Sequence, residues 1–332
     1  MRALWKKSEL GAIYVRIISV GSLGTLGYMC LEKATIATGR TKVTMLAQSA
    51  GALTNIVLDP VLICGWIGFP AMGVRGAALA TVVGQFVSLL WIGTYYVGKR
   101  RILAIRRADP VPQKRLLSDL FRIAVPAIAM QILVQVMSYG MNRILGGIKE
   151  ASVTAYGVYY KLQNFIFVPA YGRNNASIPI RSFNYGAEHK ERISRAIRWA
   201  LFHVSAIMLA GMLLLSLRTN AIVSLFAVSE TTLDLCRMAL RIIVLGFPAA
   251  GVNLILQGVC QALGNGKNSL LISLVRLILV PLPTAAALAM LPGAASIVWL
   301  STPLGEWTAC LVAVLLTRRL YRKTVAGMAG KP

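Results

Sequence analysis

Nine long hydrophobic stretches divide this chain of 332 residues, and its basic residues are concentrated in alternate gaps between them. A helix of roughly 20 such residues, rising about 1.5 Å per residue, crosses a hydrocarbon core of about 30 Å. With 57% hydrophobic residues, the chain has more apolar surface than a soluble fold could bury. The pattern predicts an all-α fold, a polytopic membrane bundle of about nine transmembrane helices. We expect the spans at Ile13–Leu31, Val43–Gly65, Gly76–Val97, Ile123–Leu145, Val153–Ile178, Trp199–Leu217, Leu235–Leu263, Leu270–Leu291 and Ile297–Leu316.

The net charge of +24 is unevenly distributed. Most basic residues fall in the gaps on one side of the predicted bundle, in the segments Lys33–Lys42, Lys99–Arg115, Lys190–Arg198 and Arg318–Lys323. Cytoplasmic loops carry an excess of Lys and Arg, so we expect this side and the C-terminus in the cytoplasm of a plasma or inner membrane. The basic segments are not interleaved with aromatic residues, and nucleic-acid binding is not expected.

A short repeat relates two parts of the chain. Ala37-Thr38-Gly39-Arg40-Thr41-Lys42 and Ala262-Leu263-Gly264-Asn265-Gly266-Lys267 share the pattern Ala-x-Gly-x-x-Lys. Each copy lies in a predicted tight hairpin and precedes two spans and a basic segment. Four spans lie between the central loop and the second copy, whereas only one precedes the first. If the two halves were once equal, three helices are absent from the start.

The repeat and the loops predict two lobes. We assign residues 1–97 to a partial N-terminal lobe of three helices, 98–119 to a cytoplasmic linker, 120–317 to a C-terminal lobe of six helices, and 318–332 to a basic cytoplasmic tail. The linker contains Asp109-Pro110-Val111-Pro112, which cannot continue a helix. Two lobes built from repeats are typical of secondary transporters.

Several motifs occur in order on the expected helices. They are Ala37-x-Gly39-x-x-Lys42, Asn55-Ile56-x-Leu58-Asp59-Pro60, Gly73-Val74-x-Gly76-Ala77-Ala78-x-Ala80-Thr81, Pro179-Ile180 with Phe183-Asn184-Tyr185-Gly186-Ala187, Gln261-Ala262-x-Gly264, and Arg276. In these motifs the chain resembles the multidrug and toxic compound extrusion (MATE) transporters over almost its whole length. We expect structural roles for Gly39, Asn55, Pro60, Gly186, Gly264 and Arg276.

The resemblance implies a cation-coupled antiporter that exports bulky, often cationic, amphipathic compounds by alternating access. It implies H⁺ or Na⁺ as the transported coupling ion, no bound cofactor, and a small organic substrate and the bilayer as partners; we expect a monomer. Members have twelve helices in two lobes, and this chain resembles helices four to twelve, so that its N-terminal lobe is incomplete. The first helix of many bacterial members carries a carboxylate important for coupling, and that helix has no counterpart here.

Two carboxylates at membrane depth are candidates for proton or cation coupling, since an ionisable group there costs about 2.5–3.5 kcal/mol and tends to be functional. Asp59 precedes Pro60, which bends its helix. Its alternative role is to accept hydrogen bonds that shape the lobe. Glu306 lies midway along the last span, at a depth similar to that of Arg276. The alternative for this couple is a buried structural ion pair.

Polar residues on the interior helices are candidates for a cavity lining. They are Gln131, Gln135, Asn164, Asn253 and Gln257, with Arg173 as a possible charged member. Gln131 and Gln135 are one turn apart and share a helix face. Each amide is alternatively an interhelical hydrogen-bond partner. Tyr139, Tyr156, Tyr159 and Tyr160 lie deep enough to stack on a flat cationic substrate, or to fill helix contacts.

No Walker A sequence, Gly-x-Ser-x-Gly motif or metal-binding spacing is present, and an enzyme is not expected. Three hypotheses stay open. The first is a cation-coupled exporter. The second is a lipid-linked precursor flippase or a polysaccharide exporter of similar architecture, which would hold anionic groups with Lys161 and Arg173. The third is a truncated remnant without transport activity, or a misassigned start codon.

Overall fold

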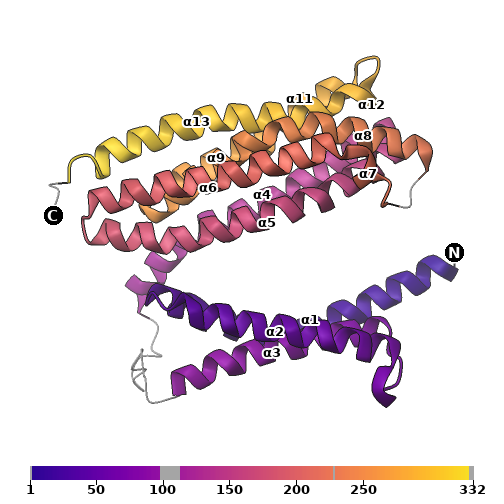
Figure 1. The fold of residues 1–332 in the computed structure, drawn as a ribbon, viewed down its shortest axis with the longest axis horizontal. Coiled ribbons are helices and arrows are strands. Elements are labelled where there is room, and N and C mark those ends of the chain that lie inside the picture. Colours follow the sequence, from indigo (N-terminus) through magenta and orange to yellow (C-terminus); the bar gives the residue numbers. More distant parts are fainter. Residues whose placement is uncertain (1, 98–112, 227–228, 329–332) are drawn as a thin grey trace. The chain divides into compact units, whose positions relative to one another are not determined.

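The computed structural model describes residues 2–97, 113–226 and 229–328, which fold into helices joined by short turns. The predicted all-α membrane fold is confirmed. The chain forms two compact units, Met1–Val111 and Pro112–Pro332, which we describe separately (Figure 1). Most of the predicted linker, residues 98–112, lies outside the described residues, and helix α4 already begins at Lys114.

Eight helical segments of the described residues are long and apolar enough to cross a membrane. The fifth of the nine predicted spans, Val153–Ile178, is not among them. It belongs to a helix of 37 residues, α5 (Glu150–Gly186), whose length is sufficient but whose sequence carries Lys161, Arg173 and Arg181. These charges lower the mean hydropathy of α5.

The first unit consists of α1 (Arg2–Ala37), α2 (Thr41–Cys64), the short helix η1 (Trp66–Gly68) and α3 (Val74–Val97). Helix α3 packs against both α1 and α2. Helices α2 and α3 meet backbone to backbone at Gly51 and Gly84. A Cβ atom on Gly84 would lie 2.7 Å from the backbone oxygen of Gly51 and 3.3 Å from Cβ of Asn55. Small residues allow such close approach in membranes, where packing replaces the hydrophobic effect.

The two copies of the Ala-x-Gly-x-x-Lys repeat have the same backbone conformation. Gly39 and Gly264 each end a helix with positive φ, +80° and +74°. The amide following each glycine bonds to the carbonyl five residues earlier, from Arg40 to Thr35 at 3.3 Å and from Asn265 to Cys260 at 2.8 Å. This is the Schellman arrangement, in which glycine adopts the left-handed conformation without steric cost. Glycine is therefore favoured over other residues at both hairpins.

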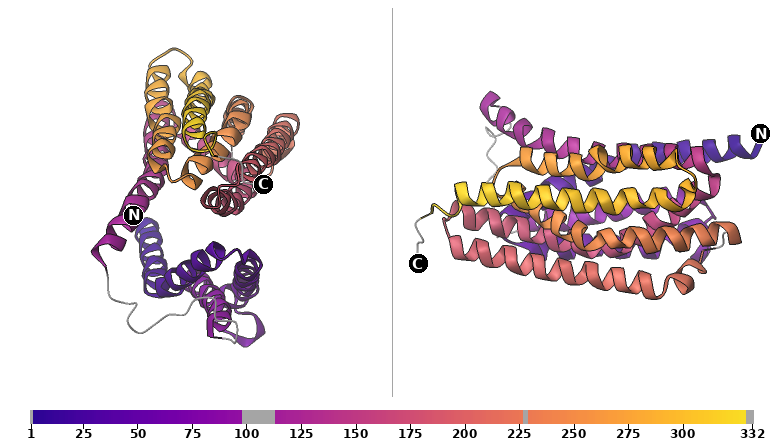
Figure 2. Two further views of the ribbon diagram at one scale, coloured as in Figure 1. Left: turned by 90° about the vertical axis from the view of Figure 1, so that its left-hand side faces the viewer. Right: turned by 90° about the horizontal axis from the view of Figure 1, so that it is seen from above.

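The second unit contains the remaining helices. They are α4 (Lys114–Ile148), α5, α6 (Lys190–Leu217), α7 (Thr219–Val223), α8 (Glu230–Ile243), η2 (Val244–Gly246), α9 (Phe247–Ala262), α10 (Gly266–Leu274), η3 (Val275–Leu279), α11 (Pro281–Ala289), α12 (Ala294–Ile297), η4 (Val298–Leu300) and α13 (Ser301–Thr324). Figure 2 shows the long helices of this unit running side by side. The predicted basic tail from residue 318 continues α13 as far as Thr324.

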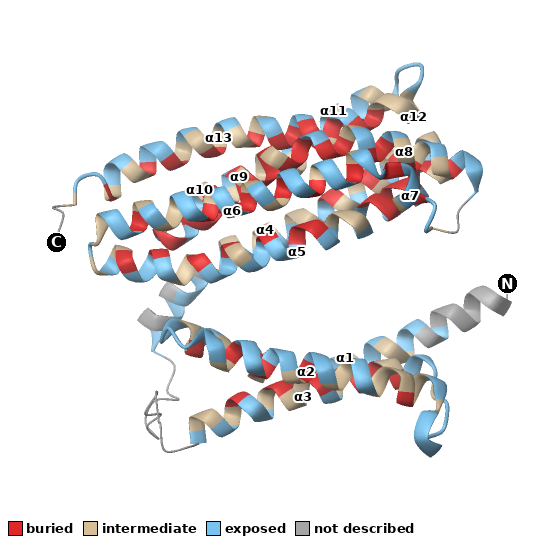
Figure 3. Ribbon diagram, in the orientation of Figure 1, coloured by how far each residue is buried: buried red, intermediate tan, exposed pale blue. Residues whose placement is uncertain are grey.

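Helix α9 is the centre of the second unit. It packs against α5, α6, α10 and α13, and 13 of its 16 residues are buried. The outer helices bury one face and expose the other, as the alternating colours along α6 and α13 show (Figure 3). The exposed faces carry large apolar side chains such as Leu213, Leu217, Leu311 and Leu315. Lipid tails are the natural environment of such faces.

Three spans of this unit are interrupted. A π-helical segment, η3, separates α10 from α11 directly before Pro281, whose nitrogen cannot donate a hydrogen bond. Short 3-10 segments similarly join α8 to α9 and α12 to α13. π-Helical turns are rare and often occur at functional sites, because they redirect the side chains that they carry. The interruption at η3 carries Arg276.

Candidate functional site

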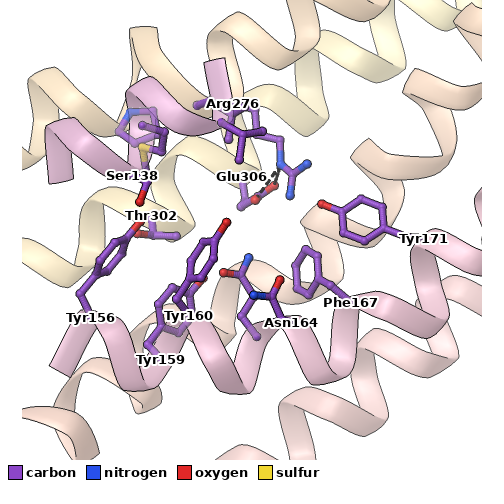
Figure 4. Close-up of a pocket in the computed structure, with 15 residues that line it drawn as sticks. Ser138, Tyr156, Tyr159, Tyr160, Asn164, Phe167, Tyr171, Arg276, Thr302 and Glu306 are labelled. Atoms are coloured by element: carbon purple, nitrogen blue, oxygen red, sulfur yellow. Dashed lines mark hydrogen bonds and ion pairs between the residues drawn. The ribbon is translucent and has the colours of Figure 1, made fainter. Parts of the chain in front are cut away.

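Arg276 and Glu306 form an ion pair inside the second unit. Arg276 Nε donates to both carboxylate oxygens of Glu306, at 2.8 Å each (Figure 4). The two residues are only 8% and 7% exposed. Arg276 belongs to η3 and Glu306 to α13, which lie in two different predicted spans. The sequence suggested them as partners because they lie at a similar depth in those spans.

A third helix completes the arrangement. Asn253 of α9 is fully buried, and its Nδ2 donates to Oε2 and to the backbone oxygen of Glu306, at 2.9 Å each. Glycine permits the close packing around the carboxylate. A Cβ atom on Gly305 would lie 3.1 Å from the backbone oxygen of Arg276, and one on Gly246 would lie 3.3 Å from Cγ of Glu306. The carboxylate therefore connects α9, η3 and α13.

The free-energy cost of burying Arg276 and Glu306 is offset by their mutual attraction. A charge placed alone at this depth would be costly, and the two opposite charges remove most of that cost only while they stay paired. Only Nε of the Arg276 guanidinium has a hydrogen bond within the described residues. Its two Nη groups thus remain available to a ligand, and the Tyr171 hydroxyl points toward them in Figure 4.

A cavity of about 100 Å³ adjoins the ion pair. Arg276, Leu277, Pro281, Thr302 and Glu306 form one part of its wall, and the other part comes from α4 and α5. The Thr302 hydroxyl is buried and has no hydrogen-bond partner among the described residues. Buried polar atoms are nearly always paired, so an unpaired hydroxyl beside a cavity is a binding position for water or a ligand.

One face of α5 supplies most of the aromatic lining. Its cavity residues are Tyr156, Tyr159, Tyr160, Gln163, Asn164, Phe167 and Tyr171. They recur at three- and four-residue intervals, which places them on a single helix face. The ring of Tyr156 lies 5.8 Å from that of Tyr159 and 6.3 Å from that of Tyr160, centroid to centroid. The cavity face of α5 is therefore a polar, aromatic stripe.

The structure brings some of the predicted residues together and separates others. Asn164 lines the cavity, and Asn253 reaches it through Glu306. Gln257 is buried on α9, where its Nε2 has no partner in the described part of the chain, but it does not line the cavity. Gln131 and Gln135 are exposed on α4 and lie outside the cavity, which meets this helix at Val134, Met137 and Ser138. Periodicity showed that the two glutamines share a face, but not where that face lies.

The remaining predicted residues lie elsewhere. Arg173 is half-buried on α5 and does not line the cavity, and Lys161 is exposed. Asp59 belongs to the first unit, where it is half-buried before Pro60 of α2 and has no hydrogen-bond or ion-pair partner in the described residues. Gly186 is the last residue of α5 and has open space around its Cα. Tyr139, another candidate for stacking, is 74% exposed.

Sequence reasoning missed Arg181, which is completely buried. Its guanidinium donates to the backbone oxygens of Ser177 (3.0 Å) and Ile255 (3.2 Å), to Oγ of Ser177 (2.7 Å) and to Oδ1 of Asn174 (3.1 Å). The predicted span ended at Ile178, which assigned Arg181 to a loop, whereas α5 continues to Gly186. Gln163, Tyr171 and Thr302 were also missed, although the periodic stripe on α5 contained a signal for the first two.

The known proteins that this chain resembles are multidrug export proteins and MATE transporters. The MatE family model matches residues 126–287, which include the cavity face of α5 and Arg276. Among curated proteins, the multidrug export protein MepA of Staphylococcus aureus MRSA252 is 22% identical over 310 residues, covering 92% of this chain and 67% of that protein. MepA of Staphylococcus saprophyticus is 23% identical over 309 residues, covering 93% and 67%.

Solved structures share the fold. An outward-facing multidrug resistance MATE transporter of the MOP superfamily superposes with a TM-score of 0.88 at 23% identity, covering 95% of this chain and 70% of its own. A MOP superfamily transporter from Pyrococcus furiosus, described as having a binding pocket of reversed polarity, gives a TM-score of 0.85 at 22% identity, with 94% and 70% covered.

Proposed function

We propose that the chain is a multi-pass membrane transporter of the MATE family and that it exports small organic compounds across the plasma membrane in exchange for H⁺ or Na⁺. The observation that carries the proposal is the Glu306 carboxylate, held by Arg276 and Asn253 at the wall of a cavity. It is a charged group that three helices share, and it lies where a cation can reach it.

Coupling in this proposal is an exchange of counter-charges. While Arg276 is paired with Glu306, the carboxylate is neutralised and η3 is tied to α13. A proton or Na⁺ bound at the carboxylate takes over that neutralisation and frees the guanidinium. A ligand shifts a conformational equilibrium only by its differential affinity for the two states. The two counter-charges of Glu306 supply such a difference, because only Arg276 ties η3 to α13 through the carboxylate.

The volume and the lining of the cavity limit which substrates it can accept. At about 100 Å³ it is smaller than the roughly 300–1,000 Å³ of a typical ligand pocket, so in this conformation it holds an ion, waters or one group of a larger molecule. The tyrosine-rich face of α5 suits a flat aromatic or cationic group. We therefore propose amphipathic aromatic compounds, cationic ones included, as substrates.

One observation favours a second candidate function. The Nη groups of Arg276 have no protein acceptor in the described residues, and a guanidinium binds carboxylates and phosphates in a bidentate manner. A substrate with an anionic group, such as a lipid-linked precursor, would find its partner there. The two candidates require opposite substrate charges, so that one assay separates them.

We also propose which end of the second unit faces the cytoplasm. The start of α6 and the end of α13 lie together, since Lys190 Nζ donates to the backbone oxygen of Ala326 at 3.1 Å. The basic residues of both segments therefore gather at one end of the second unit. By the positive-inside rule this end, with the C-terminus, faces the cytoplasm.

The test is transport by the purified chain in proteoliposomes. Uptake of a fluorescent cationic dye and of an anionic one is followed after imposing a pH gradient or a Na⁺ gradient. We expect gradient-driven uptake of the cationic dye by the wild type and at least tenfold slower uptake by Glu306→Gln. Glu191→Gln is the matched control, because Glu191 is exposed in the first turn of α6.

Three other results of this transport assay would contradict parts of the proposal. Uptake of only the anionic dye would replace the first candidate by the second. Equal uptake by Glu306→Gln and the wild type would remove this carboxylate from coupling. No gradient-driven uptake of either dye by correctly folded protein would contradict export by this chain.

A further inference from the structure

A groove of about 480 Å³ runs between α6, α9 and α13 of the second unit, away from the cavity at Glu306. Its apolar part is lined by Ile197, Leu201, Val252, Leu256 and Val314. At the basic end of the unit, three arginines border the same groove: Arg198, Arg318 and Arg322. Apolar surface thus continues directly into a concentrated positive charge.

The three arginines are exposed, and they border the groove from two helices, α6 and α13. Arg198 lies one turn after Ser194 on α6, and Arg318 and Arg322 are one turn apart on α13, so each pair shares a helix face. A hydrogen bond of 2.5 Å between the hydroxyls of Ser194 and Tyr321 joins the two helices at this level. The guanidinium groups therefore border a site whose helices are tied together.

The order of residues along the helices matches a lipid. Helix α6 leads away from the basic end, so Leu201 lies deeper in the unit than Arg198. Helix α13 leads toward the basic end, and Val314 lies one turn deeper than Arg318. On both helices the charged residue is at the end and the apolar residue is inside. A phospholipid has the same order of headgroup and acyl chain.

In the described part of the chain, the three arginines have no acidic partner. No acidic residue lines the groove, and none of the three arginines takes part in an ion pair within the described residues. Like charges held close together repel one another, and an anion between them removes that cost. Basic pockets between transmembrane helices at the cytoplasmic side are suited to anionic headgroups.

We propose that this groove binds one phospholipid with a negatively charged headgroup. Arg198, Arg318 and Arg322 hold the phosphate, and one acyl chain lies along Leu201, Leu256 and Val314. The bound lipid contacts α6, α9 and α13 at once and so stabilises the packing of the central helix. The site is separate from the transport cavity, and it does not depend on which substrate is exported.

Native mass spectrometry of the purified full chain tests this directly. The probe is phosphatidylglycerol, compared with phosphatidylcholine of identical acyl chains. We expect the wild type to retain one phosphatidylglycerol and little phosphatidylcholine. In the double variant Arg318→Gln/Arg322→Gln, retention of phosphatidylglycerol should fall about tenfold, because two of the phosphate contacts are removed. The matched control is Arg319→Gln/Lys323→Gln, which removes the same charge from positions of α13 that are equally exposed but do not line the groove.

A second variant separates a lipid from a free anion. Leu201→Trp fills the apolar part of the groove and leaves the arginines in place. It should lower phosphatidylglycerol retention and leave any effect of inorganic phosphate on the thermal unfolding midpoint unchanged. Equal loss in the matched double variant would show nonspecific attraction by the basic face. Equal retention of the two lipids, or a response to inorganic phosphate as large as to the lipid, would also overturn the proposal. Size-exclusion profiles and helical circular dichroism identify variants that fail to fold.

Discussion

The side-chain amide of Asn253 donates to both the carboxylate and the backbone carbonyl of Glu306, at 2.9 Å each. Because α9 is the central helix of the second unit, this double contact fixes the position of α13 relative to the core. It also leaves the carboxylate with a neutral donor on one side and the Arg276 cation on the other.

Replacing Asn253 by leucine should destabilise the protein by about 1.5–3 kcal/mol, because a hydrogen bond to a charged group is lost and the carboxylate stays buried. Gln257→Leu is the control one turn later on α9. The Nε2 atom of Gln257 is buried without a partner among the described residues, so its removal should be neutral or stabilising. Thermal unfolding in detergent compares the two. A larger loss for Gln257→Leu than for Asn253→Leu would contradict this account of α9.

Breaking the ion pair from either side should be costly. Arg276→Met or Glu306→Leu alone leaves one buried charge uncompensated, at about 3–5 kcal/mol. The double variant Arg276→Met/Glu306→Leu leaves none, and we expect it to be clearly more stable than the sum of the single losses predicts. A double-mutant cycle on unfolding midpoints measures this coupling. Additive losses would mean that the two side chains act independently.

The glycines of the two repeat hairpins adopt a left-handed backbone conformation, and substitution by alanine tests its cost. Gly39→Ala and Gly264→Ala should each cost about 1–2 kcal/mol, because alanine is strained at φ of +80° or +74°. Gly172→Ala is the control within α5, where a Cβ meets no atom within 4 Å. It should stabilise by about 0.5–1 kcal/mol, since alanine favours helix more than glycine. The unfolding midpoint should fall for Gly39→Ala and Gly264→Ala and rise for Gly172→Ala. A change of the same sign at all three sites would contradict the left-handed conformation assigned to Gly39 and Gly264.

The two arginines of the C-terminal half of α5 should behave differently. Arg181→Ala removes a fully buried guanidinium that bridges α5 to the Ile255 carbonyl of α9, and it should lower the yield of folded protein strongly. Arg173→Ala removes a half-buried side chain with no side-chain hydrogen bond in the described residues, and should leave folding intact. Size-exclusion yield and unfolding midpoints report both. A severe loss for Arg173→Ala would show that it is a structural charge.

The sequence by itself determined the class of fold and the repeat, and its motifs indicated the resemblance to MATE transporters. Hydrophobic length, the position of basic residues and motif order are local properties of the chain, and the bilayer converts them directly into helices. Depth along the helices was enough to suggest Arg276 as a partner of Glu306, because depth follows from counting residues. Helix ends were harder, and the end assigned at Ile178 hid Arg181.

Only the tertiary structure decided which helix faces meet. Gln131 and Gln135 share a face by periodicity, yet the cavity meets α4 at Val134, Met137 and Ser138. The orientation of a helix about its axis is set by packing against its neighbours, as at Gly305 beside Arg276 and at the π-helical turn before Pro281. The same holds for the groove at Arg198 and Arg318, whose residues are more than 100 positions apart and meet only because α6 and α13 pack on α9.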